Sequence, residues 1–224
     1  MEVEAKPPSF VPMPQHALPF QPHAVQIVLW RAPEAEAAGA DVHSFFPNRD
    51  LNGMNLQRRR EHHAVQRALS TLLQHDAWQV SHDANGKPWL HLEGQEAPTG
   101  LSITHCDVDN EVWAAVAVPS SGQPTGGIDL TPMDDPRLKR VAHRVMSTEE
   151  QARWAGREAW AWATKEAMFK GHGPALAFAT EALLLDCTGL EGGSHGEISG
   201  RVRGRAWNGI WAVMEGRVLL VWGH

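Results

Sequence analysis

Apolar residues follow two spacings along this chain, and each spacing predicts one type of secondary structure. From about residue 56 to 74, the apolar positions 65, 68, 69, 72 and 73 recur as on one face of a helix, so this stretch predicts an amphipathic helix with a basic start. The run at residues 25–30, with three β-branched residues, predicts a strand, and short apolar runs predict further strands at 78–80, 88–92, 101–104 and 112–118. Asn85-Gly86 is a dipeptide typical of a hairpin turn.

The second half of the chain repeats this coarse order of helix and strands. After a break rich in Ser and Gly at 120–127, the pattern predicts a strand at 127–130, a helical region at about 136–170, and strands in the tail at 209–214 and 217–222. Ser147 and Glu150 form a capping box, which predicts a helix start inside the helical region. We therefore expect an α+β protein with an extended N-terminal arm at residues 1–22, a first half at 23–120 and a second half at 121–224. A short helical segment is also expected near residues 35–38.

Composition narrows the class of protein without naming a function. The chain has 224 residues, of which 42% are hydrophobic and 21% charged, so a sizeable core is expected and wholesale disorder is excluded. A net charge of −6 argues against a general nucleic-acid binder. No apolar run approaches the ~18 residues of a membrane span, and the N-terminus lacks a signal-peptide pattern. The two cysteines, Cys106 and Cys187, are too few for a disulfide framework, so we expect a cytoplasmic protein.

Asp129, Glu166 and Lys170 are the residues best placed to carry chemistry. Asp129 lies at the end of a short apolar strand, and Glu166 and Lys170 are four residues apart on a predicted helix, so they project from one face. Two carboxylates could bind a hard divalent ion such as Mg²⁺, and a nearby lysine would suit a leaving phosphate. The same spacing also fits a surface ion pair between Glu166 and Lys170, with Asp129 only ending its strand.

Longer motifs around these residues resemble a known family. Gly127-Ile128-Asp129, followed downstream by Trp162-Ala163-Thr164-Lys165-Glu166-Ala167-Met168-Phe169-Lys170, resembles the paired signature of the 4′-phosphopantetheinyl transferases. The separation of Asp129 from Glu166 is typical of the longer, Sfp-like branch of that family. Further segments follow in the family's order. Gly86-Lys87-Pro88 and the stretch at 101–106 resemble segments of the Sfp-like branch, and the basic helix at 59–67 resembles that of enterobactin-type members. Arg137 and the Ser-x-x-Glu at 147–150 stand at the family's places between the two signatures. The similarity covers about residues 55–175.

The resemblance implies both an activity and a fold. Members of this family move the 4′-phosphopantetheine arm of coenzyme A onto a serine of an acyl or peptidyl carrier protein and release 3′,5′-ADP. The implied fold has two pseudo-symmetric halves, each a helix packed on a small antiparallel sheet, with coenzyme A in the cleft between them. A monomer is implied, because one chain supplies both halves.

Site residues carry over by position in the motifs. Asp129 and Glu166 are implied to hold Mg²⁺, and Glu166, or a water that it orients, is implied to accept the serine proton. Lys170 would stabilise the departing phosphate, and Lys165 would add charge support.

The first half is implied to bind coenzyme A. His105 matches a family histidine that contacts a phosphate of coenzyme A, and Thr104 stands where the family often has serine. Arg60 and Arg67 are the candidates for the 3′-phosphate and adenine side, since arginine suits bidentate phosphate contacts. Arg58 and Arg59 fit a solvated helix start equally well.

One departure from the family pattern leaves alternatives open. Many Sfp-like members carry a third carboxylate two residues after the aspartate, where this chain has Thr131. The ion would then keep an extra water or bind more weakly, with Asp134 or Asp135 as a partial substitute. The alternatives are a catalytically silent relative that binds coenzyme A or a carrier protein, a metal-dependent phosphohydrolase, and a metal-binding protein rich in histidine. The 13 histidines show no metal-type spacing, which disfavours the last.

Overall fold

The computed structural model describes residues 25–33, 45–47, 53–120 and 125–224. The expected N-terminal arm, the expected short helix near 35–38 and residues 121–124 of the Ser- and Gly-rich break lie outside the described residues. In chain order the elements are β1 Val25–Pro33, α1 Leu56–Leu73, β2 Trp78–His82, β3 Pro88–Leu92, β4 Thr99–Gly100, β5 Ser102–Val108, β6 Glu111–Pro119, β7 Gly127–Pro132, α2 Pro136–Val145, α3 Thr148–Arg153, α4 Glu158–His172, α5 Phe178–Glu181, β8 Ala182–Cys187, β9 His195–Val202, β10 Arg205–Met214 and β11 Val218–Gly223.

The described residues form a mixed α+β fold, as the sequence predicts, with few helices and with three small antiparallel sheets where one sheet in each half is expected. The sheets have the orders β1-β6-β5, β2-β3-β4 and β7-β11-β10-β9-β8. Helix α1 and the strands of the first half lie at the predicted places, while the predicted helical region at 136–170 is divided into three helices. The capping box begins the second of these, because Ser147 Oγ accepts the Glu150 N–H at 3.2 Å and the Glu150 carboxylate accepts the Ser147 N–H at 3.0 Å.

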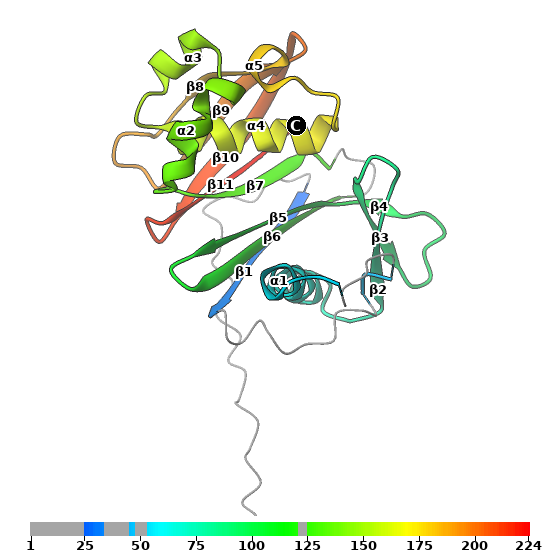
Figure 1. The fold of residues 1–224 in the computed structure, drawn as a ribbon. Helices are drawn as coiled ribbons and strands as arrows, with labels where there is room; N and C mark the ends of the chain where they lie inside the picture. Colours follow the sequence, from blue (N-terminus) through cyan, green and yellow to red (C-terminus); the bar gives the residue numbers. More distant parts are fainter. Residues whose placement is uncertain (1–24, 34–44, 48–52, 121–124) are drawn as a thin grey trace, which may run out of the picture.

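Two of the sheets, β1-β6-β5 (the first sheet) and β7-β11-β10-β9-β8 (the second sheet), stack on each other between α1 and α4. Their strands can do this because alternate side chains point to opposite faces. In β6, Val112, Ala114 and Val116 pack with α1, whereas Trp113 and Ala115 face the second sheet. In β11, the residues 218, 220 and 222 face the first sheet, and residues 219 and 221 pack with α4. The order of layers is therefore α1, sheet, sheet, α4, and Figure 1 shows α1 and α4 on the two separate sheets.

The two sheets also meet edge to edge at β5 and β7, through side chains rather than a backbone ladder. Ser102 Oγ accepts the Ile128 N–H at 3.0 Å, and Thr104 Oγ1 accepts the Leu130 N–H at 3.0 Å. These hydroxyls satisfy backbone donors of an edge strand that would otherwise be buried without a partner. These two hydrogen bonds align β7 with β5, and so they fix Asp129 on β7 relative to His105 on β5.

None of the helices in the described part of the chain combines the length and the apolarity that a membrane-spanning segment requires.

Candidate active site

Close packing of α4 on β7 brings Asp129, Glu166 and Lys170 together. A Cβ at Gly127 would lie 1.8 Å from the carbonyl oxygen of Ala167, so only glycine lets the helix backbone approach the strand this closely. Asp129 follows on the same face of β7 and points toward α4. Lys170 Nζ lies 2.7 Å from Asp129 Oδ1, and Glu166, one helical turn earlier, lines the same cavity as Asp129.

We expect Gly127→Ala to lower the free energy of unfolding by about 1–3 kcal/mol, the usual cost of overpacking. The added methyl group meets helix backbone, which cannot rotate aside as a side chain can. Gly171→Ala is the milder comparison across the same contact. Its Cβ would lie 3.3 Å from the Gly127 nitrogen, a tight contact that a shift of a few tenths of an ångström relieves, and alanine favours the helix. Urea denaturation of both variants measures the difference, and equal stability of the two would contradict this account of the packing.

Asp129 is held in place by two threonine hydroxyls and one ammonium. It is 5% exposed, Thr131 Oγ1 donates a hydrogen bond to Oδ2 at 2.7 Å, and Thr104 Oγ1 donates one to Oδ1 at 3.2 Å. Thr104 is itself buried and also accepts the Leu130 N–H, and it is not among the residues that line the two cavities described below. The sequence predicts Thr104 to bind the cofactor, whereas the structure gives it the different role of orienting Asp129.

Glu166 stands in an environment that disfavours its charged form. Burial raises the pKa of Glu166, and the negative charge of Asp129 raises it further, with Lys170 acting in the opposite direction. Two carboxylates that line one cavity, with one ammonium paired to Asp129, are an arrangement that a bound cation would stabilise.

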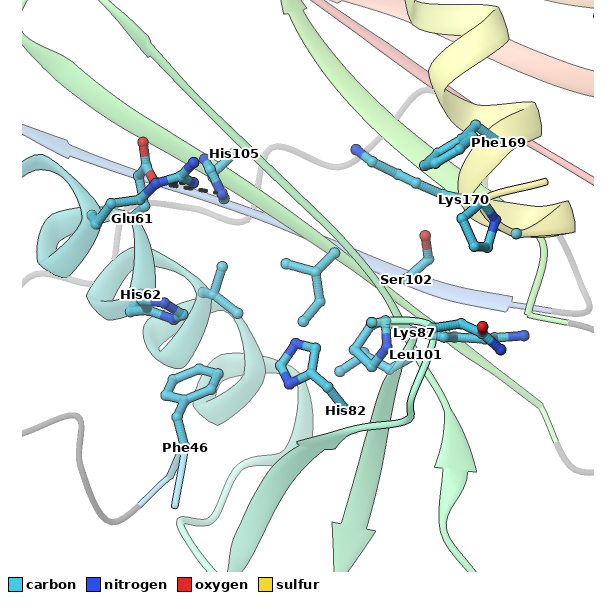
Figure 2. Close-up of a pocket in the computed structure, with 18 of the residues that line it drawn as sticks. Phe46, Glu61, His62, His82, Lys87, Leu101, Ser102, His105, Phe169 and Lys170 are labelled. Carbon is cyan, nitrogen blue, oxygen red and sulfur yellow. Dashed lines mark hydrogen bonds and ion pairs between the residues drawn. The ribbon is translucent and has the colours of Figure 1, made fainter. Parts of the chain in front are cut away.

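The site opens into two cavities that meet at one point. The first cavity, about 630 Å³, is lined by α1, the turn between β2 and β3, β5 and the end of α4. The second cavity, about 980 Å³, extends from Asp129 and Glu166 to α2. Arg58, Glu61 and His105 line both cavities, and we call the place where they lie the junction. Figure 2 shows Glu61 on α1 facing His105, with Lys170 across the first cavity on α4.

His105 lies at the junction as a neutral imidazole. Its Nε2 is 3.7 Å from Glu61 Oε2, and its side chain is 31% exposed. Burial, together with the positive charges of Lys170 and Arg58, lowers the pKa of His105 to about 4, while Asp129 acts the other way. At neutral pH His105 can therefore donate one hydrogen bond and accept another, but it brings no positive charge of its own.

The structure brings Arg58 to the cleft and turns Arg60 and Arg67 away from it. Helix α1 uses residues 58, 61, 62 and 65 to line the first cavity, whereas Arg60 and Arg67 lie half a turn around the helix. On that side His63 packs edge-on to Trp30 of β1, 5.9 Å away, and Arg67 helps lower the pKa of His63. The spacing of the residues could have predicted which arginine faces the cleft. Arg58 precedes Val65 by seven residues, close to two helical turns, so the two share a face of α1.

Lys165 does not reach the cleft either, despite lying next to Glu166. Its side chain is fully buried on the other side of α4, where Nζ donates to Glu150 Oε2 at 2.9 Å, to the Phe178 carbonyl at 2.7 Å and to the Ala182 carbonyl. The prediction that Lys165 supports the cofactor with its charge is replaced by a structural role. Of the predicted site residues, Asp129, Glu166, Lys170 and His105 line the two cavities.

Comparison of the sequence with models of known protein families gives no match, and comparison with curated proteins gives none either. The site is therefore described by its own geometry. Carboxylates, an ammonium, a guanidinium and a neutral imidazole surround a two-part cleft, which suits a ligand that carries phosphate groups in its middle.

Proposed function

We propose that this protein is a 4′-phosphopantetheinyl transferase, which moves the phosphopantetheine arm of coenzyme A onto a serine of an acyl or peptidyl carrier protein and releases 3′,5′-ADP. The observation that carries the proposal is the meeting of Asp129, Glu166 and Lys170, from two separate sequence signatures, beside the junction of two cavities. In this proposal the chain has the two-half fold of that family and acts as a monomer. Coenzyme A occupies the first cavity, and the acceptor serine enters through the second.

Asp129 and Glu166 suit Mg²⁺ as the cofactor. In the described part of the chain, no group of three or more His, Cys, Asp or Glu side chains is arranged to hold a metal ion. Mg²⁺ is commonly bound through one or two carboxylates, with substrate phosphates and waters as the other ligands, so the pair is a sufficient donor set. The raised pKa of Glu166 next to Asp129 fits this assignment, since a cation relieves the repulsion between the two. When bound, the ion neutralises charge on the pyrophosphate.

The transfer forms one P–O bond and breaks another. The serine oxygen attacks the phosphorus that bears pantetheine, and the bond from that phosphorus to the bridging oxygen of the pyrophosphate breaks. Glu166 accepts the serine proton, and 3′,5′-ADP leaves with the electron pair of the broken bond. Lys170 stabilises the leaving phosphate while keeping its contact with Asp129, because an ammonium has three donors. Arg58 and His105 bind the phosphates from the side of the junction.

Intact mass spectrometry after incubation with coenzyme A, Mg²⁺ and a panel of apo carrier proteins tests the proposal. A transferase adds a phosphopantetheine group to the carrier and releases 3′,5′-ADP in equal amount. Binding of coenzyme A without a mass gain on any carrier would indicate the silent relative. Breakdown of coenzyme A without any acceptor would indicate the phosphohydrolase.

Thr131→Glu is expected to lower the Mg²⁺ concentration for half-maximal activity by about tenfold. Thr131 is buried beside Asp129 and lines the second cavity, so a carboxylate at this position would extend toward the proposed metal ligands. Thr131→Gln has the same length without the charge and is expected to produce no such decrease. A Mg²⁺ titration of wild type and both variants measures this concentration. If Thr131→Glu needs as much Mg²⁺ as wild type, or more, Thr131 does not lie beside the metal ion.

A further inference from the structure

Glu61 is a buried carboxylate at the junction, and none of the roles assigned above uses it. The face of α1 on which it lies is otherwise apolar, with Ala64, Val65, Ala68 and Leu69 buried beyond it. Glu61 is only 7% exposed. Burying a carboxylate is unfavourable unless charged or hydrogen-bonded partners compensate, and a negative charge also repels a phosphate bound nearby. An acid at this place therefore needs a specific compensating role.

The partners of Glu61 are the two groups that face the phosphates in the proposed complex. Its Oε2 accepts a hydrogen bond from Arg58 Nη1 at 3.0 Å and lies 3.7 Å from His105 Nε2. Arg58 belongs to α1 and His105 to β5, so the carboxylate lies where the two elements meet, hydrogen-bonded to Arg58 and in contact with the neutral imidazole of His105. Among the described residues, Glu61 is the side-chain partner that holds the guanidinium of Arg58, whose side chain is 61% exposed, over the cleft.

A second contact runs parallel to the first and fixes the same pair of elements. Gln57 Nε2 donates to Asp107 Oδ2 at 2.8 Å and to Glu61 Oε1 at 3.3 Å. Gln57 and Glu61 are one helical turn apart on α1, and Asp107 and His105 are two residues apart on β5, which places each pair on one face of its element. The two contacts therefore set the register of α1 against β5 where both cavities begin.

We propose that Glu61 is a positioning residue for coenzyme A. It holds the guanidinium of Arg58 in the orientation that receives the phosphates and, through Gln57 and Asp107, keeps α1 in place beside His105, and it does not touch the reacting atoms. The inference rests on the proposed function and adds the residue on which the geometry of phosphate binding depends. In this role the order that Glu61 gives to its two neighbours outweighs its repulsion of the phosphates.

Glu61→Leu is expected to raise the KM for coenzyme A by about tenfold, with less than about a threefold change in kcat at saturating coenzyme A. Leucine suits the apolar face of α1 but can hold neither Arg58 nor Gln57. Glu61→Gln keeps one acceptor oxygen, which can receive the hydrogen bond of Arg58 but not that of Gln57 as well, and it is expected to recover part of the loss. The dissociation constant for 3′,5′-ADP, measured by calorimetry without carrier protein, is expected to rise in Glu61→Leu by the same factor. Glu93→Leu, at an exposed position outside both cavities, is the matched control.

A double-mutant cycle separates positioning from a general loss of structure. If Glu61 acts through Arg58, the KM of Glu61→Leu combined with Arg58→Ala will lie near that of the worse single variant rather than at the product of the two effects. Independent, multiplicative effects would overturn the proposal.

Two kinetic outcomes for Glu61→Leu would contradict the positioning role. A lower KM would make Glu61 a repulsive group, and an unchanged KM with a lower melting temperature would leave it a purely structural one. Either result would overturn the inference while leaving the proposed function intact, provided that the wild-type chain transfers phosphopantetheine. A wild-type chain that neither binds coenzyme A nor modifies any carrier would overturn the proposed function, and the inference with it.

Discussion

Glu166→Gln is expected to lower the rate of phosphopantetheine transfer by about 10²–10⁴-fold, the usual contribution of a general base. The variant keeps the size of the side chain but removes the charge that accepts the serine proton and binds the cation. Its stability is expected to stay equal or to rise, because burial and the neighbouring Asp129 both disfavour the charged form of Glu166 in the folded protein. Activity and stability are thus expected to change in opposite directions. Single-turnover transfer to an apo carrier and thermal unfolding measure the two effects on one sample.

Glu158→Gln is the matched control for this change. Glu158 lies two turns earlier on α4, outside both cavities, and its carboxylate accepts the Gly156 N–H at 3.0 Å. Glu158→Gln removes one negative charge from α4 outside the cleft. It therefore tests whether transfer depends on the total charge of α4 or on the carboxylate of Glu166 in the cleft. Wild-type rates in both variants would remove Glu166 from the chemistry, whereas loss in both would point to an effect on α4 as a whole.

Patterns of local spacing predict most of the elements in this fold, because each one buries a face with a simple period. Helix α1 appears where the apolar residues recur every three or four positions, and its buried residues include Val65, Ala68 and Leu69 of that series. Likewise, β6 lies at its predicted place, buried on both faces between α1 and the second sheet. The contact between Asp129 and Lys170 joins the two motifs that together make up the family's paired signature. Spacing alone does not predict this contact, because it fits a surface ion pair between Glu166 and Lys170 equally well.

The orientation of α4 is beyond what the sequence pattern can predict. Spacing does place Glu166 and Lys170 on one face and Lys165 about 100° around the helix. Alanines at positions 159, 161, 163 and 167 are buried on several sides, so the helix has no clear apolar stripe that tells which face meets β7. The roles of Thr104 and Lys165 depend on that choice and on partners far along the chain, such as Asp129 for Thr104 and Glu150 for Lys165. Such partners are set by tertiary packing and have no local signal.

Lys165→Met is expected to lower the free energy of unfolding by about 3–5 kcal/mol, the usual cost of removing one member of a buried ion pair. Lys165 is fully buried, and its loss leaves Glu150 buried without its cation and two backbone carbonyls, of Phe178 and Ala182, without their donor. Lys139→Met, at an exposed position on α2, is the control and is expected to change stability by less than about 0.5 kcal/mol. Urea denaturation gives both values.

A second substitution distinguishes the buried pair from other effects of losing Lys165. Glu150 also accepts the backbone N–H groups of Ser147 and Leu184 at 3.0 Å each, and glutamine keeps an oxygen for one of these bonds. Lys165→Met combined with Glu150→Gln is therefore expected to be more stable than the sum of the single losses predicts, because no uncompensated charge remains. Additive losses would contradict the coupling of the two residues.

The same variants test whether Lys165 acts only through the fold. Because Lys165 faces α3, α5 and the start of β8 rather than either cavity, the fraction of Lys165→Met that remains folded at low temperature is expected to keep the wild-type KM for coenzyme A. A raised KM in the folded fraction, with stability close to wild type, would instead restore Lys165 to the cofactor side of the site. Two neighbouring residues of α4 are thus expected to give opposite results. Glu166→Gln lowers the transfer rate without loss of stability, because Glu166 faces the cleft, whereas Lys165→Met lowers stability without raising the KM for coenzyme A, because Lys165 faces the core.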